Sequence, residues 1–246
     1  MKTLAIINHK GGVGKTTITL NLSAQLAKIG KKTLVIDFDP QANLSGVLLG
    51  EEESFQTIDE MMIEQLDPQP FSITDKLDIL PSSLKLAKCE RMFGGSMSGY
   101  FKLKKLLEAL PETYEYVLVD CPPSLGWLTQ NALNTADSVI IPSEPSKFSS
   151  DGFDTLVDVI DEVKETTNGA LKIEGILLSM VRNLRVHNAY SEQIREEYDD
   201  LIFECQISNL KDYTEANAMM QAVVDYAPES KASKEIETLA NELMAK

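Results

Sequence analysis

Cysteine and histidine are scarce in this 246-residue chain, and their scarcity excludes several kinds of site. The three cysteines, Cys89, Cys121 and Cys205, are scattered without a CxxC spacing, and the two histidines, His9 and His187, lie far apart. A disulfide framework or a structural zinc site needs paired, regularly spaced ligands. We therefore expect the cysteines to be small buried hydrophobic residues.

Long apolar runs are also missing. No stretch approaches the roughly 20 apolar residues of a membrane-spanning helix. The first twelve residues, MKTLAIINHKGG, are too soon interrupted by polar residues to form a signal peptide, and they indicate a buried strand instead. With no targeting segment, we expect a cytoplasmic protein.

Basic residues are in the minority. Lys and Arg total 23 against 38 Asp and Glu, which gives a net charge of −15. A chain this acidic repels DNA and anionic membranes at long range. Any contact with a polyanion therefore requires a local basic patch.

The chain does contain a regular alternation of apolar runs and helical periodicity. Strands are expected at 3–8, 32–38, 77–83, 116–123, 137–145, 171–181 and 201–207, and helices at 16–29, 102–110, 124–136, 152–167, 188–198 and 231–245. Continuous apolar strands alternating with helices predict an α/β fold, with a mostly parallel twisted sheet covered by helices on both faces. Because no linker, repeat or low-complexity stretch divides the chain, we expect one domain over residues 1–246.

The first expected strand runs into a glycine-rich loop with the sequence HKGGVGKTT, at 9–17. Gly14-Lys15-Thr16 completes the phosphate-binding P-loop pattern, but His9 stands where that pattern begins with glycine. Glycines let backbone N–H groups approach a phosphate closely, and the following helix N-terminus adds partial positive charge. Three glycines serve this purpose here: Gly11, Gly12 and Gly14.

Three side chains after these glycines have expected roles at a nucleotide. Lys15 reaches the β- and γ-phosphates, Thr16 offers its hydroxyl to Mg²⁺, and Thr17 reaches the region of the α-phosphate. We find no NKxD-type segment, which guanine specificity usually requires, and this absence favours ATP over GTP.

Three carboxylates follow expected strands. Asp37 and Asp39 end the strand within LVIDFDPQAN, and Asp120 ends the strand within VLVDCPPS. Carboxylates at the C-terminal ends of strands beside a P-loop strand hold Mg²⁺ or orient an attacking water. Capping and turn roles are the competing interpretation for any one of them alone.

The segment KGGVGKTT, from Lys10 to Thr17, resembles the deviant Walker A motif of the ParA/MinD family of P-loop ATPases. DFDPQAN resembles that family's second motif, and VLVDCPPSLGWLTQNAL resembles its third. Length and motif order agree from end to end, and the resemblance is closest to the ParA/Soj branch of DNA-partitioning ATPases.

This resemblance implies an ATP-dependent homodimer that hydrolyses ATP slowly, with Mg²⁺, and is accelerated by a ParB-like or other activating partner. Lys10 would be the signature lysine that crosses to the partner subunit's phosphates, and Asp39 the catalytic aspartate that positions water. Asp37 and Asp120 would belong to the Mg²⁺ environment. The loop, Val13 included, would surround the phosphates, and a looser mapping places Met180 and Val181 near the adenine.

The C-terminal third departs from the family pattern at LLSMVRNLRVHNAY and ISNLKDYTEANAMM. Family members use arginines in these segments for non-specific DNA binding, and Arg182, Arg185 and Lys211 are the candidates here. Ordinary solvated charge is an equally weighted interpretation. The clusters Lys85/Lys88/Arg91 and Lys102/Lys104/Lys105 are further candidates, although the second alternates with a core-facing apolar stripe.

Several functions remain open at this point. The resemblance predicts partitioning of a plasmid or chromosome, with nucleoid association of the ATP-bound state, or positioning of a protein cargo. A MinD-like membrane ATPase is disfavoured, because the C-terminal segment SKASKEIETLANELMAK carries glutamates and no aromatic residue. An iron–sulfur reductase or an ATP-dependent ligase lacks the expected cysteine context, and a pseudo-ATPase conflicts with the intact P-loop lysines and Asp39.

Overall fold

The computed structural model describes residues 1–50, 52, 54–111, 113–146 and 149–246. Within these residues, eight strands form one sheet in the order β3-β4-β2-β5-β1-β6-β7-β8. All described strand pairings are parallel except that of β3 with β4. The strands are β1 (Lys2–Ile6), β2 (Thr33–Asp37), β3 (Phe71–Thr74), β4 (Leu77–Leu80), β5 (Tyr116–Asp120), β6 (Ser138–Ser143), β7 (Lys172–Val181) and β8 (Ile202–Ser208).

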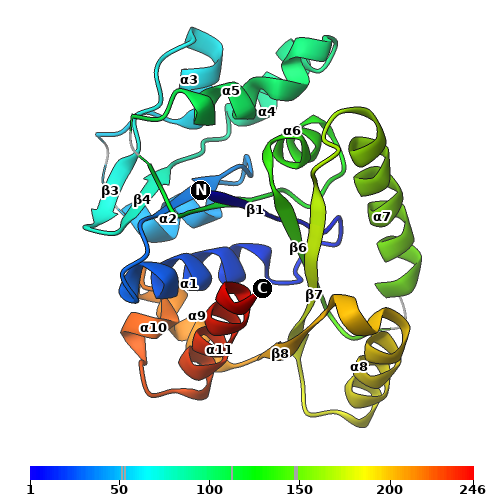
Figure 1. Ribbon diagram of the computed structural model, residues 1–246. Coiled ribbons are helices and arrows are strands. Elements are labelled where there is room, and N and C mark those ends of the chain that lie inside the picture. Colours follow the sequence, from blue (N-terminus) through cyan, green and yellow to red (C-terminus); the bar gives the residue numbers. More distant parts are fainter. Residues whose placement is uncertain (51, 53, 112, 147–148) are drawn as a thin grey trace.

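Helices cover both faces of this sheet (Figure 1). One face packs against α1 (Lys15–Lys28), α2 (Asn43–Leu49), α9 (Lys211–Ala218), α10 (Val223–Tyr226) and α11 (Lys231–Ala245). The other packs against α3 (Ile58–Glu64), α4 (Leu86–Phe93), α5 (Lys102–Glu108), α6 (Trp127–Thr135), α7 (Ser149–Thr166) and α8 (Arg185–Tyr198). Two short 3₁₀ helices, η1 (Met97–Phe101) and η2 (Asp199–Leu201), complete the described elements.

The side-chain alternation of the strands builds a separate core on each face. In β1, Leu4 and Ile6 belong to the core beneath α1 and α11, whereas Ala5 belongs to the core on the opposite face. All three are fully buried. Because both faces are covered, the strands are apolar throughout, which is the pattern expected of a parallel sheet between two helical layers.

The predicted α/β fold with a mostly parallel sheet is confirmed, and each predicted strand and helix is present within a few residues of its expected bounds. The sequence pattern missed β3, the antiparallel edge strand, which has four residues and only partial burial. It also missed helices α2, α3, α9 and α10, which have eight residues or fewer. Elements this short carry too little periodicity to stand out from loops.

Candidate functional site

The glycine-rich loop connects β1 to α1 at the C-terminal edge of the sheet (Figure 1). Gly12 and Gly14 adopt φ angles of 78° and 89°, in the left-handed region that only glycine enters without strain. Among the described residues, no acceptor pairs with the backbone N–H groups of Gly12, Val13 or Gly14. The loop therefore presents free donors beside a helix N-terminus, which is an arrangement that binds anions.

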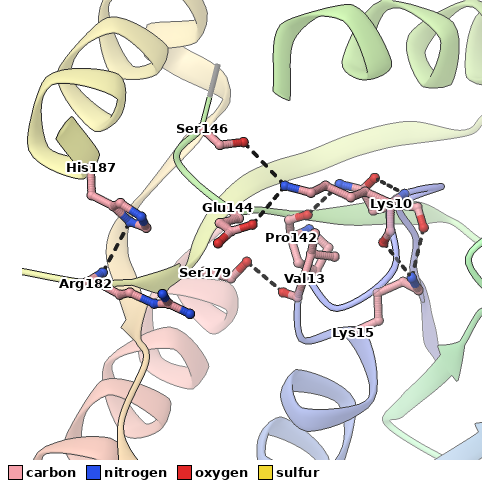
Figure 2. A network of polar contacts seen from close by, with 10 residues as sticks. Lys10, Val13, Lys15, Pro142, Glu144, Ser146, Ser179, Arg182 and His187 are labelled. Atoms are coloured by element: carbon pink, nitrogen blue, oxygen red, sulfur yellow. Dashed lines mark hydrogen bonds and ion pairs between the residues drawn. The ribbon is translucent and has the colours of Figure 1, made fainter. Parts of the chain in front are cut away.

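Lys15 folds back over this loop, as Figure 2 shows. Its Nζ donates to the carbonyl oxygens of Asn8 at 2.9 Å and Lys10 at 3.3 Å. The side chain is buried, and this desolvation lowers the pKa of the Lys15 ammonium, while the charge of Asp120 acts in the opposite direction. Among the described residues its only partners are carbonyl oxygens, which a phosphate can replace.

Lys10 points across the loop toward the segment that follows β6 (Figure 2). Its Nζ donates to Glu144 Oε2 at 2.8 Å and to Ser146 Oγ at 3.3 Å. Its backbone N–H donates to Asn8 Oδ1 at 2.9 Å. The Lys10 side chain is 35% exposed and that of Glu144 26% exposed, so this ion pair lies at the surface rather than in the core.

Asp120 is the last residue of β5, and the strand register places it beside both Asp37 of β2 and Ile6 of β1. It is buried, and its Oδ1 accepts from Thr19 Oγ1 at 3.4 Å. Its Oδ2 has no hydrogen-bond partner among the described residues. Burial raises the pKa of Asp120 well above its usual range, and the negative charge of Asp37 raises this pKa further. Hydrogen bonding by the side chain of Thr16 acts in the opposite direction.

Asp37, by contrast, has both carboxylate oxygens engaged. Its Oδ2 accepts from the backbone N–H and the hydroxyl of Ser45 at 2.8 and 2.7 Å, and its Oδ1 accepts from the Asp39 N–H at 3.2 Å. Burial raises the pKa of Asp37 to about 6 despite these hydrogen bonds. Asp39 is only partly buried, and its Oδ1 accepts from the Gln41 N–H at 2.9 Å.

This donor set fits a magnesium ion that is bound largely by phosphate and water. No group of three metal-ligating side chains exists within the described part of the chain. Mg²⁺ commonly takes one or two carboxylates and completes its shell with water and phosphate oxygens. The unpartnered Oδ2 of Asp120, near Thr16, is the oxygen in this region that most needs such a cation.

A pocket adjoins the loop. Of the two residues expected near the adenine, Met180 lines this pocket and Val181 does not. Met180 has a φ of 53°, and the hydroxyl of Ser179 donates to the Val13 carbonyl at 2.8 Å. The lining residues are Val13, Gly14, Thr17, Ile18, Ser179, Met180, Ile207, Ser208, Asn209, Leu210, Tyr213, Thr214 and Asn217.

The sequence predicted four of these thirteen residues, and most of the others come from the end of β8, the turn after it and α9. Asn217 Oδ1 is a buried acceptor with no partner among the described residues. The sequence feature that could have indicated these residues is the end of the expected strand near Ser208, because the strand ends of a parallel sheet lie along one edge. Only the position of β8 next to β7 in the sheet shows that the residues after Ser208 lie beside Met180.

The three candidate DNA-binding residues follow two neighbouring strands. With its amide oxygen turned toward the guanidinium, Asn209 accepts from Arg182 Nε at 3.1 Å and Nη2 at 3.2 Å. Arg185 is the first residue of α8, and Lys211 begins α9, where it pairs with Glu215 at 3.2 Å. All three are exposed, but Arg182 is held beside the cavity and Lys211 is paired within its own helix.

Comparison with known proteins decides the family. A family model described as an AAA domain matches residues 1–173. The chain is 34% identical to the sporulation initiation inhibitor protein Soj of Bacillus subtilis, over 99% of this chain and 98% of that protein. It is also 34% identical to the chromosome partitioning protein ParA of Myxococcus xanthus, over 99% of this chain and 88% of that protein.

The chain belongs to the ParA/MinD-type family of P-loop ATPases. Solved structures agree with this membership. A plasmid partition protein from Borrelia burgdorferi bound to AMPPNP superposes with a TM-score of 0.86 at 25% identity, covering 99% of this chain and 98% of that one. Cobyrinic acid a,c-diamide synthase from Mycobacterium smegmatis, with ADP and magnesium, superposes with a TM-score of 0.85 at 26% identity, covering 99% and 94%.

Within this ParA/MinD-type chain, the C-terminal helix α11 uses its apolar side in the core. Ile236, Leu239 and Leu243 are buried, in the core that also contains residues of α1 and β8. Throughout the described residues, no helix is long and apolar enough to cross a bilayer.

The cysteines lie apart, as buried thiols in α4, after β5 and in β8. Burial raises the pKa of Cys89 to about 11 and that of Cys121 well above its usual range. The prediction that they are buried hydrophobic residues is confirmed.

Proposed function

We propose that this protein is an ATP-dependent dimerisation switch with slow, Mg²⁺-dependent ATP hydrolysis. The observation that carries the proposal is the position of Lys10. Its ammonium lies at the surface beside the phosphate loop, held only by Glu144 and Ser146 among the described residues. A cation placed there can leave its own subunit and reach a nucleotide bound by a second copy.

Within one subunit, the loop N–H groups and Lys15 hold the β- and γ-phosphates. Thr16, Asp120 and Asp37 would hold Mg²⁺, which would supply neutralisation of the developing phosphate charge. Asp39, partly exposed at the mouth of the site, orients the attacking water. The adenine enters the cavity against Met180.

Lys10 acts on the partner subunit's nucleotide. The transferred phosphoryl group spreads negative charge over its oxygens, and a cation supplied in trans stabilises that charge as an arginine finger does. Hydrolysis removes the γ-phosphate that Lys10 helps to hold, so the dimer loosens. The same contact therefore couples dimerisation to the state of the nucleotide.

The cellular role we propose is partitioning of a plasmid or chromosome, through non-specific DNA binding by the ATP dimer and a ParB-like activating partner. The names of the relatives support partitioning. The net charge of −15 predicts weak, salt-sensitive DNA binding, with Arg185 the most available of the three candidate contacts. Positioning of a protein cargo by the same cycle is the alternative, and a MinD-like membrane association is a weaker one.

The central test is the mass of the protein with ATP, with ADP and without nucleotide, measured by sedimentation velocity. Lys10→Ala is expected to bind ATP but stay monomeric, Lys15→Ala to lose ATP binding, and Asp39→Ala to accumulate the ATP dimer. Normal ATP-dependent dimerisation of Lys10→Ala would refute the trans role of this lysine.

A second test separates DNA from other matrices. Binding to random-sequence duplex DNA is measured at low and moderate salt with each nucleotide, using Asp39→Ala as the trapped dimer and Arg185→Ala as the contact variant. ATP-dependent binding that weakens with salt supports partitioning on DNA. Its absence from the trapped dimer favours the protein-cargo alternative.

A further inference from the structure

The outer side of helix α4 combines cationic and apolar side chains. Its inner side buries Leu86 and Cys89 in the core. On the other side, Lys88, Arg91 and Met92 follow the i, i+3, i+4 spacing that places side chains on one side of a helix, and Leu84 and Lys85 lie in the turn that leads into it. We use the name α4 face for these five exposed residues: Leu84, Lys85, Lys88, Arg91 and Met92.

The α4 face lies in a basic stretch of an acidic sequence. Residues 84–105 contain six Lys or Arg and one Glu, a net charge of +5, so the rest of the chain carries −20. Among the described residues, no carboxylate lies within 4 Å of Lys88 or Arg91, while Lys85 approaches Glu60 at 3.4 Å. The single acidic residue, Glu90, is engaged elsewhere, because its Oε1 accepts from the Trp127 N–H at 3.0 Å.

The apolar members of the face are among the most exposed large hydrophobic residues of the protein. Leu84 is 73% exposed and Met92 57% exposed. Single exposed hydrophobic residues are common, but in the sequence these two flank unpaired cations, Leu84 just before the helix and Met92 within it. Methionine is also adaptable in shape, which suits it to binding surfaces. The face therefore complements a ligand that carries both negative charge and apolar groups.

From this complementarity we infer that the α4 face binds a short acidic, amphipathic segment of a partner protein. Its Asp or Glu carboxylates pair with Lys88 and Arg91, and its apolar side chains cover Leu84 and Met92. The phosphates of a nucleic acid would pair with the cations but leave Leu84 and Met92 uncovered. No aromatic residue belongs to this face for base stacking. A duplex or a bilayer also presents extended negative charge, which is repelled by the net charge of −20 on the rest of the chain. A short segment avoids this repulsion because it stays within about one Debye length, ~8 Å, of the cations.

The inference is tested with the full-length protein and a fluorescein-labelled helical peptide of Glu and Leu, by fluorescence anisotropy. A peptide with Gln in place of Glu is the probe for charge. The Glu peptide is expected to bind, to weaken as salt is raised, and to bind at least about tenfold more tightly than the Gln peptide. Random-sequence duplex DNA and phosphatidylglycerol vesicles are titrated in parallel.

Two double variants test whether the peptide binds at the α4 face, and a third double variant controls for the change in net charge. Lys88→Glu with Arg91→Glu is expected to weaken binding of the Glu peptide by about tenfold or more. Leu84→Ser with Met92→Ser is expected to weaken it severalfold without a change in salt dependence. Lys164→Glu with Lys234→Glu, which reverses two exposed lysines on α7 and α11, gives the same change in net charge and should leave binding unaltered.

Three outcomes overturn the inference. The first is that the wild-type protein does not bind the Glu peptide. The second is that the charge reversal on α4 weakens binding no more than the matched control does. The third is that DNA or vesicles bind through the α4 face while the peptide does not. All substituted side chains are exposed, and circular dichroism checks that each variant is folded. Because the readout is peptide binding without ATP, its failure leaves the dimerisation switch untouched.

Discussion

Replacing Glu144 by Gln should strengthen the ATP-bound dimer. In the single chain the Lys10 ammonium is paired with the Glu144 carboxylate at 2.8 Å, and on the proposed mechanism this ion pair must break before Lys10 can cross. Glutamine keeps the length of the side chain and removes its charge. The substitution therefore releases the lysine without opening a cavity.

The expected magnitude follows from the exposure of the pair. With side chains 35% and 26% exposed, the pair resembles a surface salt bridge, which contributes about 0.2–1 kcal/mol. A dimer breaks two such pairs, so the association free energy improves by about 0.4–2 kcal/mol. At about 1.4 kcal/mol per factor of ten, the dimer Kd should fall about 2- to 30-fold.

The assay is sedimentation velocity over a protein concentration series at saturating AMPPNP and Mg²⁺, so that hydrolysis does not deplete the dimer. Glu115→Gln is the matched control, because Lys31 and Glu115 form a comparable surface pair at 2.9 Å. An unchanged or weaker dimer in Glu144→Gln would refute the reasoning. An equal gain in Glu115→Gln would attribute the effect to net charge alone.

Three further predictions concern the site. In the nucleotide-free protein, the raised pKa of Asp37, about 6 against 3.8, means that the folded state binds more protons between about pH 4 and pH 6. The free energy of unfolding should fall as pH rises through that window, and urea titrations should show a weaker fall for Asp37→Asn. Ser179→Ala removes the 2.8 Å hydrogen bond to the Val13 carbonyl; thermal unfolding should show a loss of about 1 kcal/mol, and calorimetry weaker ATP binding. Thr214→Trp fills the cavity and should weaken ATP binding at least about tenfold in the same calorimetric assay, because the adenine is excluded; unchanged affinity would place the base elsewhere.

The sequence by itself determined the α/β fold class, the phosphate-binding loop and the edge of the sheet on which the site lies. Apolar runs that alternate with helical periodicity encode a parallel sheet between two helical layers, because each strand must be apolar on both sides. The glycines of the loop directly follow β1 and precede α1, so their role depends on neighbours in sequence. Asp37 and Asp120 end their strands, and strand ends of a parallel sheet meet at one edge.

Only the tertiary structure decided which residues meet there. Lys10 and Glu144 are 134 positions apart, and they pair because β6 lies beside β1 in the sheet. Ser45 reaches Asp37 only through the turn into the short helix α2. Asn209 joins the cavity because β8 lies beside β7. Strand order is set by packing of the whole chain, and no local pattern of residues carries it.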